Sequence, residues 1–208
     1  MKALPLAATL LFTAPVSAGL VNGGFEDFNV WGYGFYSGTI PQDGWATTAP
    51  DNLIEVWENG FLGVPAYEGN SFAELNANYA STLYQHVEGI GAGTTVNWHF
   101  AHRGRDGTDT MRLTIRDLGN DKGAGKGNDT ILFTQEFSAS ATAWEVNYGS
   151  IVSLGNTMSF EFEAVNAVGG NTQGNLIDWC DFGVGAVPAP GALVLLAFTG
   201  FLSFRRRA

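Results

Sequence analysis

Thr95-Val-Asn-Trp-His-Phe-Ala-His102 carries a large apolar residue at every second position, and Thr110-Met-Arg-Leu-Thr-Ile-Arg116 does the same. This period of two is typical of a β-strand that buries one face. The intervening Gly104-Arg-Asp-Gly107 has the glycine and aspartate of a tight turn. Together the two segments predict neighbouring antiparallel strands joined as a β-hairpin.

Further strand-like segments combine β-branched or aromatic residues with flanking glycine, asparagine or aspartate. They cover residues 53–57, 72–75, 82–87, 130–137, 144–152, 158–165 and 176–184. No long segment has a helical period, and the chain contains 28 glycines. Many short strands with frequent turns predict an all-β fold, an antiparallel two-sheet sandwich, and specifically a jelly roll.

Residues 1–18 have the three parts of a secretory signal peptide. A single positive charge at Lys2 precedes an apolar stretch over residues 4–12, and small residues end the segment. We expect cleavage between Ala18 and Gly19, which leaves residues 19–186 as one folded domain of an exported protein. A buried N-terminal helix is the alternative.

The tail, residues 187–208, differs in character from the domain. Pro188-Ala189-Pro190 precedes an uncharged apolar stretch over residues 191–204, and Arg205, Arg206 and Arg207 follow. As a helix the stretch rises about 21 Å, so a membrane core of roughly 30 Å would also take up flanking residues. The pattern predicts a membrane-anchor helix, and its arginines place the C-terminus in the cytoplasm with the domain outside.

This tail resembles the PEP-CTERM sorting signal of Gram-negative bacteria that secrete exopolysaccharide, with Ala189 in place of the usual glutamate. The resemblance implies an exosortase-type processing enzyme that cuts at the proline element. It also implies anchoring in the inner membrane before processing and delivery to the cell surface or extracellular matrix afterwards. A plain membrane anchor is the alternative.

The charge of the chain limits its partners. The formal net charge is −10, and all 20 acidic residues lie between positions 19 and 186. Such a surface repels phosphate backbones, which argues against nucleic acid as a partner. Cys180 is the single cysteine and lies in an apolar strand pattern, so we expect a small buried side chain rather than a disulfide or a reactive thiol.

Several short motifs resemble the galactose-binding-like jelly rolls of carbohydrate-binding modules. The motifs are Val21-Asn-Gly-Gly-Phe-Glu26, Gly69-Asn-Ser-Phe-Ala-Glu-Leu-Asn76, Leu83-Tyr-Gln85 and Ile177-Asp178. The resemblance implies neighbouring first and last strands and a structural Ca²⁺ held by Glu26 and Asp178, since calcium takes oxygen ligands. The alternative is a solvated pair of acids at strand ends.

Sugar binding needs a flat aromatic ring with polar groups beside it. Trp31, Trp57 and Tyr67 are candidate platforms, together with Tyr33 and Tyr36, because all lie in glycine-rich segments before residue 95. The alternative for each ring is packing in the core.

Arginines on the polar side of the expected hairpin could hold sugar hydroxyls through charged hydrogen bonds. Arg103 is the candidate, with His99, Arg112 and Arg116 on the same expected face. The alternative is that these arginines pair with neighbouring acids such as Glu161 and Glu163 on a solvated sheet.

Catalytic motifs are not apparent in the sequence. The histidines lack HExxH spacing, no G-x-S-x-G motif occurs, and the acid pair Glu161 and Glu163 lies on one strand. We therefore expect a non-enzyme. The sequence favours an exported sandwich that binds extracellular polysaccharide, and the alternative is a structural or interaction component of the cell surface or biofilm matrix without sugar specificity.

Overall fold

The computed structural model describes residues 19–119 and 129–184. The expected signal peptide with Ala18, the tail with Pro188, Ala189 and Pro190, and the anchor arginines 205–207 lie outside the described residues. Within the described ranges, no helix is long and apolar enough to cross a membrane.

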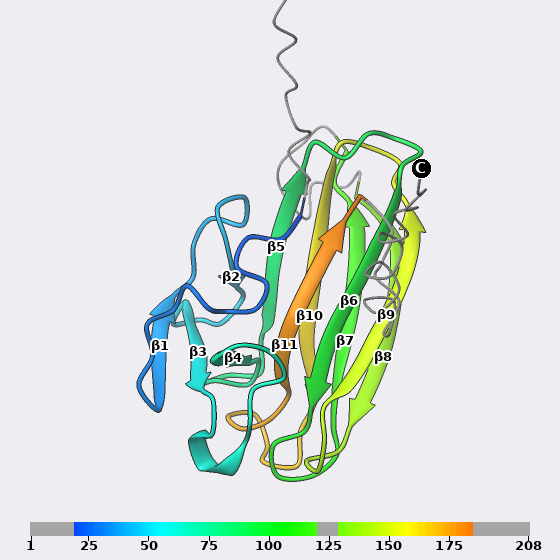
Figure 1. The fold of residues 1–208 in the computed structure, drawn as a ribbon. Helices are drawn as coiled ribbons and strands as arrows, with labels where there is room; N and C mark the ends of the chain where they lie inside the picture. The colour runs from blue at the N-terminus through cyan, green and yellow to red at the C-terminus, as the bar shows by residue number, and fades with distance from the viewer. Residues whose placement is uncertain (1–18, 120–128, 185–208) are drawn as a thin grey trace, which may run out of the picture.

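The described residues form short strands in two antiparallel sheets, so the all-β two-sheet sandwich is confirmed (Figure 1). The strand order is β1-β3-β4-β11-β6-β9 in the six-stranded sheet and β2-β5-β10-β7-β8 in the five-stranded sheet. The elements are β1 Tyr33–Ser37, β2 Ala46–Thr47, β3 Leu53–Glu58, the 3-10 turn η1 Phe61–Gly63, β4 Ser71–Glu74, β5 Thr82–Glu88, β6 Thr95–Arg103, β7 Asp109–Asp117, β8 Thr130–Ala139, β9 Glu145–Val152, β10 Thr157–Asn166 and β11 Leu176–Gly183.

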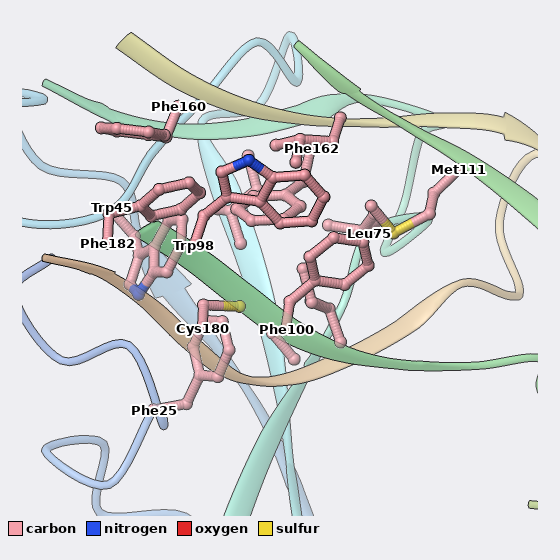
Figure 2. Close-up of a cluster of buried hydrophobic side chains, with 14 of the residues drawn as sticks. Phe25, Trp45, Leu75, Trp98, Phe100, Met111, Phe160, Phe162, Cys180 and Phe182 are labelled. Carbon is pink, nitrogen blue, oxygen red and sulfur yellow. The ribbon is translucent and has the colours of Figure 1, made fainter. Parts of the chain in front are cut away.

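The alternation that predicted β6 and β7 is confirmed. Val96, Trp98 and Phe100 are at most 3% exposed, and the apolar residues of β7 are fully buried. Both sets point into one core between the sheets, where Phe100 of β6 meets Phe162 of β10 with ring centroids 5.4 Å apart (Figure 2). Burial of these large side chains supplies most of the driving force for the sandwich.

The predicted hairpin is wrong, because β6 and β7 lie in different sheets. β6 pairs with β9 and β11, whereas β7 pairs with β8 and β10. The connection over residues 104–108 carries the chain across the core from one sheet to the other. Strands that face each other and strands that pair side by side both bury alternate residues, so the period alone does not distinguish them.

The resemblance implied neighbouring first and last strands, but the first strand, β1, pairs with β3, and the last strand is instead contacted by the turn around Gly23. The Cys180 backbone N–H donates to the Gly23 carbonyl at 3.0 Å. The backbones approach so closely that a Cβ at position 23 would overlap the Cys180 carbonyl oxygen. Cys180 itself is 5% exposed and belongs to the core, which confirms the expected small buried side chain.

Candidate functional site

The outer face of the six-stranded sheet carries aromatic and acidic side chains at one edge. Tyr33 and Phe35 of β1 lie opposite Trp57 and Glu55 of β3 in the register, so all four side chains point to the same face. Neither strand shows a clean polar and apolar alternation, because the outer positions are aromatic as well. β1 and β3 thus build a surface on which aromatic rings surround an acidic side chain.

A pocket of about 340 Å³ lies on this edge of the face. Its aromatic and aliphatic members are Tyr33, Phe35, Phe61 and Leu62, its buried members are Glu55 and Trp57, and loop residues Ala77, Asn78, Arg105 and Thr172 complete it. Tyr33 is 52% and Phe35 is 42% exposed. The pocket therefore offers open ring surfaces next to polar groups.

Arg105 connects the polar groups at the base of the pocket. Its Nη1 donates to both carboxylate oxygens of Glu74, at 3.0 and 3.1 Å. Its guanidinium lies 4.6 Å from the centroid of the Trp57 ring. The Trp57 indole N–H in turn donates to Glu55 at 2.8 Å. These contacts hold the Arg105 guanidinium, a hydrogen-bond donor, and the Glu55 carboxylate, an acceptor, both against Trp57.

Two buried carboxyl groups, Glu55 and Glu74, lie opposite each other on β3 and β4. Burial raises the pKa of Glu74 to about 7, and the nearby Glu55 adds to the shift, whereas the Gly174 N–H and Arg105 oppose it. Burial also raises the pKa of Glu55. The Gly174 N–H, the Trp57 indole and the Arg105 guanidinium together therefore stabilise this acidic pair inside the fold.

Asp109 holds the loops that bring Arg105 and Thr172 to the pocket. Its buried carboxylate accepts the N–H groups of Arg105 at 2.9 Å, Val168 at 2.8 Å and Asn175 at 3.0 Å. These bonds join the 104–108 connection to the loop before β11. Multiple N–H donors on one buried carboxylate fix the loops by satisfying polar groups that burial would otherwise penalise.

His102 extends this buried network beneath the loops. Its Nε2 lies 3.0 Å from Oδ1 of Asn175. Burial lowers the pKa of His102 to about 4, although Asn175 and Asp109 oppose the shift. His102 is therefore neutral at physiological pH, which suits its fully buried position.

Glu26, which is exposed, and Asp178, which is buried, both bind backbone N–H groups at the end of one loop, residues 59–70. Glu26 accepts the N–H groups of Asn70 and Ser71, both at 2.9 Å. Asp178 accepts those of Tyr67 at 2.8 Å and Glu68 at 3.1 Å. Both carboxylates thus act as anchors for this loop, which covers a second apolar cluster on the outer face of the sheet.

The pKa of the Asp178 carboxyl reflects its burial first and the neighbouring Glu26 last. Burial raises the pKa of Asp178 to about 7, N–H donors oppose the shift, and Glu26 adds to it. Over residues 19–119 and 129–184, no group of three or more His, Cys, Asp or Glu side chains could hold a metal. A calcium ion here would take its remaining oxygens from the backbone or from water, so Ca²⁺ stays a prediction.

Of the predicted sugar-binding residues, the structure brings Tyr33 and Trp57 to the pocket and leaves the others outside it. Trp57 is 1% exposed beneath Arg105, which corrects the prediction that it presents an open ring. Trp31 is 84% exposed but does not line the pocket. Tyr67 contacts other aromatic rings, and Arg103 donates to the Ala141 carbonyl, both outside the pocket.

The other arginines of the expected hairpin form ion pairs on the five-stranded sheet. Arg112 contacts Glu136 and Glu163, each at 2.6 Å, and Arg116 contacts Glu161 at 3.0 Å. The pairing alternative is confirmed for these two. They do not share a face with Arg103, because β6 and β7 lie in different sheets.

Sequence reasoning missed Phe35, Phe61, Leu62 and Arg105 as pocket residues. One signal was present: Tyr33-Gly-Phe35 places two aromatic rings two positions apart, hence on one face of a strand. Arg105 carried no such signal, because its position depends on the loops that Asp109 holds.

No protein-family model matches this chain, and no curated protein matches it. Solved structures include the C-terminal family 22 carbohydrate-binding module of Clostridium thermocellum Xyn10B, at 17% identity over 78% of this chain and 94% of that chain, with a TM-score of 0.48. The CBM22-1 xylan-binding domain of Paenibacillus barcinonensis Xyn10C matches at 12% identity over 72% and 91%, with a TM-score of 0.47. TmCBM61, solved with β-1,4-galactotriose, matches at 15% identity over 78% and 95%, with a TM-score of 0.44. At these identities the similarity is limited to the arrangement of strands.

Proposed function

We propose that this chain is a non-catalytic carbohydrate-binding protein whose pocket holds a sugar unit of an extracellular polysaccharide. The observation that carries the proposal is the pocket itself, in which the exposed rings of Tyr33 and Phe35 lie beside Glu55 and Arg105. Aromatic faces bind the C–H side of a sugar ring, and polar groups fix its orientation.

The charges at the base of the pocket favour a neutral sugar. Arg105 already binds both oxygens of Glu74, so its positive charge is offset within the protein. Glu55 adds an acceptor for hydroxyl groups and repels carboxylate or sulfate groups. A neutral polysaccharide is therefore the class of ligand that fits the charges of this pocket best.

A panel of neutral and acidic polysaccharides in affinity electrophoresis tests this proposal. We expect retardation by a neutral polymer, and about a tenfold weaker affinity for the Tyr33→Ala and Phe35→Ala variants, since exposed rings at a binding site carry much of its energy. Trp31→Ala is the matched control, because this ring is exposed yet outside the pocket. Binding that survives both pocket substitutions would overturn the pocket as the site.

The competing function is a structural component of the surface or biofilm matrix without sugar specificity. Failure of the whole panel to retard the wild-type protein would favour that function. Loss of binding in Trp31→Ala with full binding in the pocket variants would instead move the sugar site to the turn before β1.

We further propose that the protein is exported and sorted by its two terminal segments. The supporting features are the signal-peptide pattern ending at Ala18 and Gly19, the Pro188-Ala189-Pro190 element and the arginines 205–207. Processing by an exosortase-type enzyme would release the protein from the inner membrane to the surface or matrix. Mass spectrometry of the mature protein tests this, and an intact Ala208 would support a plain anchor instead.

A structural calcium ion at Glu26 and Asp178 is also a proposal. Its support is that both carboxylates bind the same loop and that Glu26 adds to the raised pKa of Asp178, an effect that a cation would relieve. We expect EDTA to lower the melting temperature of the purified protein and added Ca²⁺ to restore it. An unchanged melting temperature would contradict the proposal, and Glu26→Gln should abolish any calcium response.

A further inference from the structure

Trp179 owes its position to an irregularity in β11. Asp178 lies opposite Ala101 and Asp181 lies opposite His99, so two residues of β11, Trp179 and Cys180, oppose the single residue Phe100 of β6. This is a β-bulge, which re-aims side chains. Cys180 fills the core while Trp179 stays half-buried on the outer face.

The backbone at Trp179 is strained in a way that a bulky residue rarely tolerates. Its φ is 51°, in the left-handed region, and its N–H is held by the Asp178 carboxylate at 2.7 Å. A glycine or asparagine would adopt this conformation more easily. Such strain is characteristic of functional sites, where the surrounding structure holds one side chain in place.

Trp179 belongs to a continuous aromatic surface. Its ring centroid lies 5.2 Å from that of Tyr67 and 3.9 Å from that of His99. Tyr148 of β9 lies opposite His99 in the register and is 68% exposed. The rings of Tyr67, Trp179 and His99 contact one another, and the register places Tyr148 beside His99 on the same face, so the four side chains form an aromatic platform.

The groups beside this platform are acceptors rather than positive charges. Burial lowers the pKa of His99, while Asp181 and Glu68 oppose the shift. His99 is 7% exposed, and its Nε2 has no hydrogen-bond partner among the described residues. An acidic ligand would meet Glu68 and Asp181 here, whereas the hydroxyl groups of a neutral sugar could bond to them.

We propose that Tyr67, Trp179 and Tyr148 form a second contact for a neutral polysaccharide, separate from the pocket. This inference rests on the proposed function and extends it. Both sites lie on the outer face of the six-stranded sheet, and loop 59–70 contributes Phe61 and Leu62 to the pocket and Tyr67 to the platform. The ligand is then an internal segment of a polymer long enough to cross that loop, and not a chain end held in the pocket alone.

Two linked contacts on one polymer have a measurable signature. The second contact becomes intramolecular once the first is made, so affinity rises with chain length only when the oligosaccharide spans both sites. A short oligosaccharide that fills the pocket gains nothing from the platform. The length dependence therefore distinguishes the platform from the pocket.

The experiment uses the full chain and the neutral polysaccharide retained in affinity electrophoresis, with short and long oligosaccharides prepared from it. Calorimetry should give about a tenfold weaker affinity of Tyr148→Ala and Trp179→Gly for the long oligosaccharide, with unchanged affinity for the short one. Trp31→Ala is the control for an exposed ring elsewhere. Melting curves confirm that each variant is folded, and Tyr148→Ala removes a side chain that is already largely exposed.

The possible results distinguish failure of the second contact from failure of the proposed polysaccharide binding as a whole. Wild-type affinity of both platform variants for the long oligosaccharide would overturn the second contact and leave the pocket standing. Equal loss for short and long oligosaccharides would also overturn it, because the platform would then be part of a single site. A wild-type protein that binds no neutral polysaccharide would overturn both proposals.

Discussion

Arg105 shows how one side chain can serve both stability and binding. It lies in the connection between the two sheets, yet its guanidinium reaches Glu74 on β4 and the ring of Trp57 on β3. The Arg105 side chain is 16% exposed and that of Glu74 is fully buried. The ion pair is therefore shielded from water, and loss of Arg105 leaves the buried Glu74 carboxyl without its hydrogen-bonding partner.

We predict that Arg105→Met lowers the free energy of unfolding by about 3 kcal/mol, the usual cost of breaking a buried pair. Urea unfolding measures this change. Arg112→Met is the control, since its ion pairs lie on the solvated face and exposed pairs contribute little. Equal effects of the two substitutions would contradict the proposed role of Arg105.

The buried titratable groups predict how stability depends on pH. Glu74 and Asp178 have pKa values raised to about 7, so the folded state binds their protons more tightly than the unfolded state, and this contribution falls as pH rises toward and through about 7. His102, with its pKa lowered to about 4, acts in the opposite direction, and its contribution to stability is lost as pH falls below 6.5, the ordinary histidine value.

Above pH 6.5 the two carboxyl groups, Glu74 and Asp178, therefore dominate the change of stability with pH. We expect the free energy of unfolding, measured with urea in EDTA, to decrease between about pH 6.5 and about pH 8. Glu74→Gln should make this decrease smaller, because it removes one titrating group. A stability that rises over this interval would show that the carboxyl groups are not protonated as the structure indicates.

Residue identity alone predicted the site only in part. Trp57 was a candidate because it is a tryptophan near glycines, but its outer position is covered by Arg105. The open rings are Tyr33 and Phe35, and the register with β3 is what places them beside Glu55. Exposure depends on which loop covers a strand, and a side chain's own sequence neighbourhood does not contain that information.

The connection from β6 to β7 carries the chain from the six-stranded sheet to the five-stranded sheet. Gly104 lies at the corner, where a Cβ would overlap the carbonyl oxygens of Gly107 and Ala139. Backbone segments approach one another there more closely than any side chain permits. The connection thus requires glycine for space at this point.

We predict that Gly104→Ala destabilises the fold by about 2 kcal/mol, in the range for overpacked sites. Gly183→Ala is the matched control, because an added Cβ at that strand position meets nothing within 4 Å. Thermal or urea unfolding of the two variants gives the comparison. A Gly104→Ala protein as stable as Gly183→Ala would show that the corner can relax.

At the level of elements, the alternation of apolar residues predicted which residues face the core but not which strands pair. Met111, Leu113 and Ile115 are fully buried, as their period required. Their strand pairs with β8 and β10 instead of β6 because the connection crosses the core. β1 escaped prediction, since its outer positions hold Tyr33 and Phe35 and the polar half of the pattern is missing.

The two outer faces of the whole molecule have different chemistry. On the five-stranded sheet, Arg112 and Arg116 pair with acids of neighbouring strands and leave a solvated, self-neutralising surface. On the six-stranded sheet, exposed rings border the pocket and the platform around Trp179. This asymmetry supports the proposed binding site on one face of the sandwich.

The asymmetry predicts that charge substitutions on the five-stranded sheet leave binding intact. Arg112→Ala should retain wild-type affinity for any polysaccharide that the protein binds, because both of its partners, Glu136 and Glu163, lie on that sheet. Affinity electrophoresis beside Tyr33→Ala provides the comparison. Loss of binding in Arg112→Ala alone would place the ligand on the five-stranded sheet and contradict the proposed site.

Nuclear magnetic resonance titration of the full chain with the retained neutral polysaccharide tests the central claim most directly, because backbone amide shifts report contacts on both sheets at once. We predict that the amide shift changes are concentrated in β1, β3 and loop 59–70, next to the pocket residues Tyr33, Phe35 and Glu55. Shifts concentrated around Arg112 and Arg116 on the five-stranded sheet would contradict it.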